Sequence, residues 1–436
     1  MLTRLKLSHI MKKYFMSVAA MAGMMTLAAC SSDDVVVNND NDVQTIQIAV
    51  ASTGDRATRS RDLNSEEPGQ NIQTVKVVIR NKNTHEVVYV GTIDNWNTNG
   101  VSTEYTTDGH GRYATLSLTG NDRLNAGTYT ITAVGYTEDD FKDNTVTTAA
   151  KGSTIADNFT ATVNDGKDAQ EAFAGESEIT LAEDHAAIKP TVTLHRQVAG
   201  YYGYFTSIPV QIEGKEVTDV RLVARSKNTK LEFGKFNSDF KDAASGSIMY
   251  VVNGSGTATA DAKFKGSATD DAYELYDIKV KDWFKDGDTN NDGILDEKDT
   301  GWENALADNG YQTYQKGTIF AGGFAVPFAA TADKTLELQL LAEDGTILKA
   351  INVSMATAQT AGDVLGSTTK TTETPSAFSF FRNHMYTIGK KLQNKGTNPD
   401  PGVDPDVPEP LDKTQNIVIR VNDNWEVINH LVLGDE

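Results

Sequence analysis

Cysteine is almost absent from this sequence, with one residue among 436. A single cysteine cannot form an internal disulfide or a cysteine-based zinc site, so neither stabilises the fold. Basic residues are scarce as well: 40 Lys and Arg stand against 60 Asp and Glu, a formal net charge of −20. Because phosphate binding needs a clustered basic surface, this charge argues against nucleic acid as a partner.

Aromatic residues make up only 8% of the chain. After the first thirty residues, no segment approaches the roughly 20 apolar residues of a membrane-spanning helix. Thr, Asn, Asp and Gly are abundant instead. This composition favours an exported all-β protein over a cytosolic α/β enzyme.

Catalytic signatures are also missing. The sequence has no Gly-x-Ser-x-Gly elbow, no His-Glu-x-x-His, no phosphate-binding Gly-x-x-x-x-Gly-Lys and no dinucleotide fingerprint. Carboxylates paired in space, as in glycoside hydrolases, leave no mark in the sequence, and such a pair stays open as an alternative. We predict that the protein is not an enzyme.

The first thirty residues have the pattern of an export signal. An apolar run, Tyr14–Ala29, ends at Leu27-Ala28-Ala29-Cys30 and follows the basic residues Arg4, Lys6, Lys12 and Lys13. A basic start, a short apolar run and small residues before the cut are typical of a secretory signal, here residues 1–29. Cys30 stands where a bacterial lipobox places the residue that is lipidated, which predicts a lipoprotein; an ordinary signal peptide is the alternative.

Beyond the signal, apolar and polar residues alternate with period 2, which predicts many short β-strands separated by Gly, Asn and Asp turns. The alternating residues lie at 75–79, 88–90, 116–118, 129–133, 192–194, 220–222, 278–280, 336–340 and 351–353. Stretches around 137–170 and 355–375 are expected to be loops or short helices. A change of composition near Ala186–Pro190 predicts two β-sandwich domains, at 62–188 and 189–397.

The C-terminal part, residues 398–436, combines a spacer with a terminal strand. Five of the ten prolines lie in Asn398–Pro410. Because proline lacks an N–H donor and fixes φ, this stretch should act as a stiff, extended spacer. The strand-like segment Gln415–Leu433 follows it, and must pack against its own domain or pair with another chain.

The two ends of the chain carry matching strands. Ile46-Gln47-Ile48-Ala49-Val50 and Ile417-Val418-Ile419-Arg420-Val421 both read Ile-x-Ile-x-Val. Since a one-residue slip turns every apolar side chain outward, both could fill one groove in one register. A polar linker containing Arg56, Arg59 and Arg61 follows the first strand and is a target for a trypsin-like protease.

These features predict polymerisation. Residues 30–61 form a lipidated pro-segment whose strand (Ile46, Ile48, Val50) leaves after cleavage at one of the three arginines. The C-terminal segment of the next subunit, with Ile417, Ile419, Val421, Trp425 and Val427, then fills the vacated groove. Donor and groove are different surfaces, so the contact is head-to-tail and produces an open filament.

This arrangement resembles the type V fimbrillins of Bacteroidales, the major fimbrial subunit family. Thr193–Ala199 is similar to the family's opening of the second domain, and Arg382–Ile388 to its last core strand. The resemblance implies two tandem β-sandwiches of the transthyretin-like Greek-key type with an N-terminal pro-strand and a C-terminal donor strand. It also implies a palmitoylated outer-membrane precursor with a transient lipid anchor, an arginine-specific protease, identical or related subunits as partners and a surface fimbrium serving adhesion.

One loop has the spacing of a calcium site. In the twelve residues 288–299, oxygen ligands fall at the EF-hand positions, with Gly293 at the sharp turn. An Asp stands at position 12, where Glu is usual. The expected ligands of a structural Ca²⁺ are Asp288, Asn290, Asp292, Ile294, Asp296 and Asp299.

A monomeric outer-membrane lipoprotein that binds glycan or protein is the alternative function. Four tryptophans could act as stacking platforms, although buried tryptophans are commoner in β-sandwiches: Trp96, Trp283, Trp302 and Trp425. Such a protein would keep Cys30 and would not need Gln415–Glu436. The arginine linker and the terminal strand favour a stalk pilin, with an accessory subunit as the further possibility.

Overall fold

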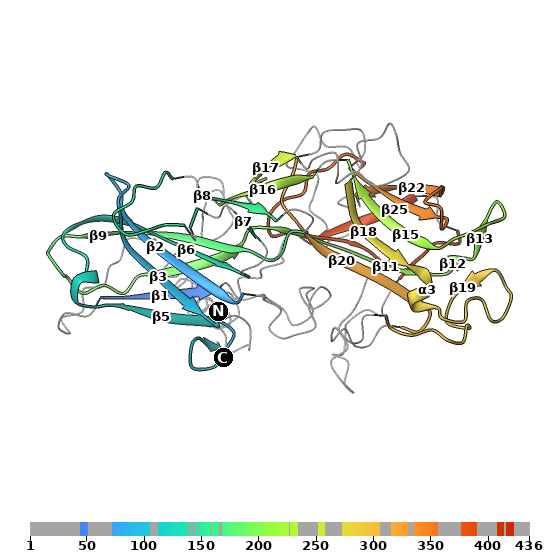
Figure 1. Ribbon diagram of the computed structural model, residues 1–436, viewed down its shortest axis with the longest axis horizontal. Coiled ribbons are helices and arrows are strands. Elements are labelled where there is room, and N and C mark those ends of the chain that lie inside the picture. The colour runs from blue at the N-terminus through green and yellow to red at the C-terminus, as the bar shows by residue number, and fades with distance from the viewer. Residues whose placement is uncertain are drawn as a thin grey trace, which may run out of the picture.

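The computed structural model describes residues 44–50, 72–104, 112–137, 141–142, 145–146, 148–157, 159–164, 168–225, 227–233, 252–257, 273–305, 315–329, 335–355, 376–389, 408–413 and 416–422. Their regular structure is nearly all β-strand, in two large sheets joined by a smaller one (Figure 1). This confirms the predicted all-β class with two tandem sandwiches. All the candidate strands named above overlap an observed strand.

The first sheet has eight strands, in the spatial order β3 (Val87–Asp94), β2 (Thr74–Asn81), β6 (Gly127–Tyr136), β9 (Phe173–Leu181), β10 (Thr191–Arg196), β1 (Gln44–Val50), β5 (Arg112–Leu118) and β4 (Thr103–Glu104). Neighbours are antiparallel except β10 and β1, which are parallel. β10 passes from one layer of the sandwich to the other: its residues 191–194 pair with β1 and its residues 195–196 pair with β9. Two layers therefore enclose one core, with β1 and β5 beneath β2 and β9 in Figure 1.

The second sheet has the order β18 (Tyr273–Lys279), β15 (Asp219–Ala224), β21 (Leu336–Leu341), β22 (Ile347–Met355), β25 (Asn416–Asn422), β23 (Met385–Ile388), β11 (Ala199–Thr206) and β20 (Thr318–Ala325). A ninth strand, β24 (Glu409–Pro410), pairs with β11 beyond the end of β23. In this sheet β25 is the strand that passes from one layer to the other. Leu, Ile, Val and aromatic side chains from both layers form the core.

A smaller sheet joins the two sandwiches, in the order β17 (Gly254–Thr257), β16 (Asn228–Phe233), β8 (Phe159–Val163) and β7 (Phe141–Lys142). The expectation of loops or helices around 137–170 is therefore wrong for residues 141–142 and 159–163, while residues 356–375 of the second such stretch lie outside the described residues. Phe159, Ala161 and Val163 alternate with threonines and are buried, because β8 pairs with β16 of the other sandwich. The local pattern is short, and its partner lies about 70 residues away in the sequence.

Short elements complete the fold. Two short antiparallel pairs join β12 (Ile208–Pro209) to β19 (Ile294–Leu295) and β13 (Gln211–Ile212) to β14 (Lys215–Glu216), of which the second is a hairpin. Within the described residues, the helical segments are the 3₁₀ turn η1 (Gly120–Asp122) and α3 (Val280–Trp283). Among the described residues, no helix has the length and apolarity to cross a bilayer.

The chain passes from the first sandwich to the second at Gln197–Val198. β10 lies after the division expected between residues 188 and 189, yet its partners β9 and β1 both belong to the first sheet. β11 begins at Ala199, and its partners among the described residues are all strands of the second sheet. The composition changes before the last strand of the first sandwich has been added.

Candidate functional site

β1 is an internal strand of the first sandwich. Residues 44–49 pair antiparallel with residues 113–118 of β5, and residues 47–50 pair parallel with residues 191–194 of β10. The position between these two segments is called the β1 seat. Residues 47–49 are paired on both sides, which is the fullest pairing a strand can have.

The apolar residues predicted for the removable strand all face the core. Ile46 and Ile48 are 0% exposed and Val50 is 1% exposed. They pack among the side chains of β2, β6 and β10 in one hydrophobic core. Burying such side chains contributes about 1.5–3 kcal/mol each, so β1 is a major part of the first core.

Gln44, which the sequence analysis does not predict, also belongs to the β1 seat. Its side chain is fully buried at the start of β1. Its Oε1 accepts a hydrogen bond from the Leu124 backbone N (2.6 Å), and its Nε2 donates to the backbone carbonyls of Leu124 (2.9 Å) and Ala186 (3.1 Å). The only sequence signal is its place two residues before Ile46, in phase with the buried side chains.

β25 lies inside the second sandwich, one of the two fates predicted for the C-terminal strand. Residues 416–419 pair parallel with β22, and residues 420–422 pair antiparallel with β23. This position is called the β25 seat. Ile417 and Ile419 are 0% and 1% exposed and belong to the second core, and the backbone of Val421 pairs with that of Tyr386.

The end of the proline spacer is fixed to the second sandwich. Glu409 and Pro410 form β24 alongside β11. Leu411 is fully buried, and its backbone N donates to the carbonyl of Thr206 (3.0 Å). The spacer therefore docks before β25 begins, in an edge position that proline tolerates.

The remaining predicted residues of the processing and donor machinery lie outside the described residues. They are the lipidation residue Cys30, the linker arginines Arg56, Arg59 and Arg61, and the donor residues Trp425 and Val427. Of the other three tryptophans, Trp96 and Trp283 are buried, and half-buried Trp302 donates its indole N–H to the Thr318 carbonyl (2.8 Å). Burial disfavours Trp96 and Trp283 as stacking platforms for a glycan.

A buried polar cluster joins the two seats. Arg196, the last residue of β10, donates from Nε to the Oε1 of Glu171 (2.9 Å), and both side chains are 0% exposed. Arg196 also reaches the Oδ1 of Asn383 (3.5 Å), just before β23. Beside this pair, Gln197 Oε1 accepts a hydrogen bond from Arg382 (3.3 Å). β10 is a neighbour of β1, and β23 is a neighbour of β25. The polar cluster therefore contacts one neighbouring strand of each seat, or the residues next to it in the chain.

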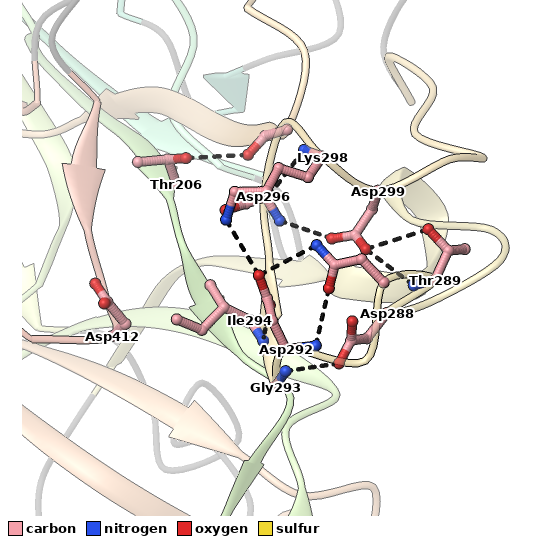
Figure 2. A network of polar contacts seen from close by, with 12 residues as sticks. Thr206, Asp288, Thr289, Asp292, Gly293, Ile294, Asp296, Lys298, Asp299 and Asp412 are labelled. Carbon is pink, nitrogen blue, oxygen red and sulfur yellow. Dashed lines mark hydrogen bonds and ion pairs between the residues drawn. The ribbon is translucent and has the colours of Figure 1, made fainter.

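The loop at residues 288–299 is closed by its own hydrogen bonds (Figure 2). Asp288 Oδ2 accepts from the Gly293 N (2.8 Å), while its Oδ1 is buried without a hydrogen bond. Asp299 is 0% exposed, and its carboxylate accepts from the backbone N of Thr289 and of Asp296, each at 2.9 Å. Loop closure thus uses the carboxylates at the first and last predicted ligand positions.

A lysine lies between two of the other predicted ligands. Lys298 Nζ is 3.1 Å from Asp292 Oδ2 and 3.0 Å from Asp296 Oδ2. The two carboxylates raise the pKa of Lys298, and its ammonium lowers the pKa of Asp292. Within the described residues, no group of three or more His, Cys, Asp or Glu is arranged to hold a metal ion. Calcium binding stays a prediction, and a calcium ion would have to displace Lys298.

Comparison with known proteins gives matches only among solved structures. No family model and no curated protein match the chain. The chain is similar to a cell adhesion protein from Parabacteroides distasonis (12% identity, TM-score 0.41, 86% of this chain and 96% of that one). A fimbrial assembly protein of the same species matches with 13% identity and a TM-score of 0.36, over 80% of this chain and 92% of that one. The tip fimbrial protein of Porphyromonas gingivalis matches with 9% identity and a TM-score of 0.32, over 81% of this chain and 96% of that one.

The names of these structures are those of fimbrial and adhesion proteins, the class that the sequence resembles. With identities near one tenth and TM-scores below 0.5, they add no residue-level information. The functional proposal therefore rests on the chain's own strands and contacts.

Proposed function

We propose that this protein is a pilin, a structural subunit of a cell-surface fimbria that joins identical or related subunits by donor-strand exchange. One observation carries the proposal: β1 is an internal strand with buried Ile46, Ile48 and Val50, and its only covalent link to the rest of its sandwich runs through residues 51–71. That link contains Arg56, Arg59 and Arg61. A strand in this position can be detached by one proteolytic cut.

Loss of β1 would leave a groove that only another strand can fill. The backbones of β5 and β10 would lose their partners, and the core around Ile46, Ile48 and Val50 would be open to water. Each unpaired buried backbone group costs about 1–3 kcal/mol, and the apolar loss adds to it. Strand addition from another chain restores both kinds of contact.

β25 supports the choice of donor. It carries the Ile-x-Ile-x-Val pattern, and like β1 it has one parallel and one antiparallel neighbour. In its own seat each residue from 416 to 422 is paired on one side, whereas residues 47–49 of β1 are paired on both. Backbone hydrogen bonds contribute about 1 kcal/mol each, so the β1 seat offers this pattern the fuller ladder.

The order of events follows from the sequence features around the groove. Lipidation at Cys30 would hold the precursor at the outer membrane, and an arginine-specific protease would release β1 together with the lipid. The C-terminal segment of the next subunit would then enter the groove. The resulting contact is head-to-tail, and repeated addition builds a surface fibre suited to adhesion.

Limited trypsin digestion of the purified precursor tests the proposal. We expect a cut among Arg56, Arg59 and Arg61, located by N-terminal sequencing, followed by a ladder of oligomers on native gels. A variant with all three arginines changed to Gln is the control and should stay monomeric. Deleting residues 415–436 should also abolish the ladder while leaving the cut intact.

A permanent monomer after a clean cut would contradict strand exchange. That result would favour the alternative, an anchored lipoprotein that binds glycan or protein. The alternative also predicts that the mature protein retains Cys30, which mass spectrometry of cell-surface material distinguishes.

A further inference from the structure

The apolar residues of β1 do not by themselves define its register. Ile46 and Ile48 repeat with period 2, so a slip of one residue is forbidden but a slip of two places isoleucine on isoleucine. Gln44 removes this ambiguity. Its carboxamide is fully buried and makes three hydrogen bonds to backbone atoms, two with Leu124 and one with Ala186.

Both partner residues lie in connections between strands of the first sandwich. Leu124 is buried just before β6, and Ala186 lies in the connection from β9 to β10. A strand shifted by two residues would bring either Ile46 or Asp42 to this place, and neither an apolar side chain nor a carboxylate can donate to the two carbonyls. The buried Leu124 N–H and carbonyl and the partly buried Ala186 carbonyl would then lose this partner, which is costly.

The donor segment has the same residue at the same offset. Gln415 stands two residues before Ile417, as Gln44 stands two before Ile46, so both segments read Gln-x-Ile-x-Ile-x-Val. This seven-residue pattern occurs nowhere else in the chain. Gln415 itself lies outside the described residues.

We propose that the β1 seat is a register-specific site for residues 415–421 of a second copy of this chain, with the Gln415 amide replacing that of Gln44 at Leu124 and Ala186. The inference rests on the proposed strand exchange and adds its register. In this register Val418 takes the place of Gln47, which lies opposite Thr115 of β5.

Disulfide trapping tests the register directly, because cleavage removes Cys30 and leaves the mature chain without cysteine. A donor with Val418→Cys is mixed with acceptors that carry Thr115→Cys, Tyr113→Cys or Ser117→Cys. Cross-strand neighbours lie at separations a disulfide can bridge. We expect linked dimer with Thr115→Cys at least about tenfold above the other two, since a two-residue slip would lose the hydrogen bonds of the Gln415 amide.

Substitution of the amide should relax this preference. In the donor, Gln415→Leu should raise the share of dimer linked at positions 113 and 117 several-fold, whereas the control Asn416→Thr, which copies β1, should leave the distribution unchanged. In the cut precursor, Gln44→Leu should speed release of the N-terminal fragment about tenfold over the matched control Gln47→Leu, whose position is only half-buried.

The outcomes separate the two proposals. An oligomer ladder with equal linkage at 113, 115 and 117, or with no effect of Gln415→Leu, overturns the register site and leaves strand exchange standing. A ladder without linkage from Val418→Cys means that residues after 422 are the donor, which also overturns it. Absence of any ladder overturns strand exchange itself.

Discussion

β1 and β25 share a sequence pattern but are held in different ways. β1 stays within one layer of the first sandwich and is paired on both sides over residues 47–49. β25 crosses from the layer of β22 to the layer of β23, so no residue in it is paired on both sides. The same alternation of isoleucines therefore serves a fully paired strand in one sandwich and a bridging strand in the other.

The apolar pattern of a strand therefore does not determine how firmly the strand is held. Ile48 and Ile419 are equally buried, at 0% and 1% exposure. The difference lies in the backbone ladder and in polar anchors such as Gln44. In the proposed strand exchange one strand is lost and the other is donated, so the proposal expects the two strands to differ in these contacts.

The largest expected effect comes from the polar cluster that links the two seats. Glu171→Leu leaves buried Arg196 without its carboxylate partner, and should lower the free energy of unfolding by about 3–5 kcal/mol. Urea denaturation measures this loss, and hydrogen exchange should show faster exchange in both β1 and β25. Glu178→Leu is the matched control, since its ion pair with Lys82 is exposed and should contribute no more than about 1 kcal/mol.

Alanine substitutions in the two strands should separate the seats. Ile48→Ala and Ile419→Ala should each cost about 2–5 kcal/mol, because each leaves a cavity in a packed core. The first should raise hydrogen exchange in β5 and β10, and the second in β22 and β23. If either substitution loosens both sandwiches equally, the two seats are not independent and the comparison fails.

Acid should weaken the β25 seat before the β1 seat. Burial, with a further contribution from the charge of Arg382, lowers the pKa of His384 to about 4. A histidine with a folded pKa below its unfolded value of about 6.5 stabilises the protein above pH 6.5, and this contribution is lost as the pH falls toward 4. His384 immediately precedes β23, the antiparallel neighbour of β25.

The expected loss between pH 7 and pH 5 is about 2 kcal/mol. Urea denaturation at the two pH values measures it, with His384→Gln as the comparison protein because its amide does not titrate. The difference between the two slopes isolates the histidine from the acidic groups that also titrate. Equal slopes for the two proteins would show that His384 does not contribute.

Local alternation predicted most of the fold. Strands such as β2, β6 and β21 follow from period-2 patterns, and the predicted Ile46, Ile48, Ile417 and Ile419 face their cores. Which strands become neighbours is not a local property. The pairing of β8 with β16 joins residues 159–162 to residues 230–233, and no pattern in either segment identifies the other.

The role of Gln44 and the position of Lys298 could not be predicted from the sequence either, because both depend on contacts made only in the folded protein. Gln44 is ordinary in sequence, and its role depends on Leu124, eighty positions away. The calcium spacing at 288–299 is a local pattern and was easy to find. The spacing does not predict that Lys298, a residue of the same loop, lies between Asp292 and Asp296. The ion pairs of a flexible side chain depend on the folded conformation of the loop.

The smallest effect concerns that loop, which belongs to the sandwich that holds β25 and has no counterpart beside β1 in the described residues. If the predicted ligands bind Ca²⁺, the Lys298 ammonium competes for two of them, and Lys298→Met should tighten binding about tenfold. Calorimetric titration of the mature protein with millimolar Ca²⁺ measures this, with exposed Lys281→Met as the control. Asp299→Asn should abolish the heat. No heat from either the parent protein or Lys298→Met would rule out calcium, and would leave Lys298 as the cation that holds the loop closed.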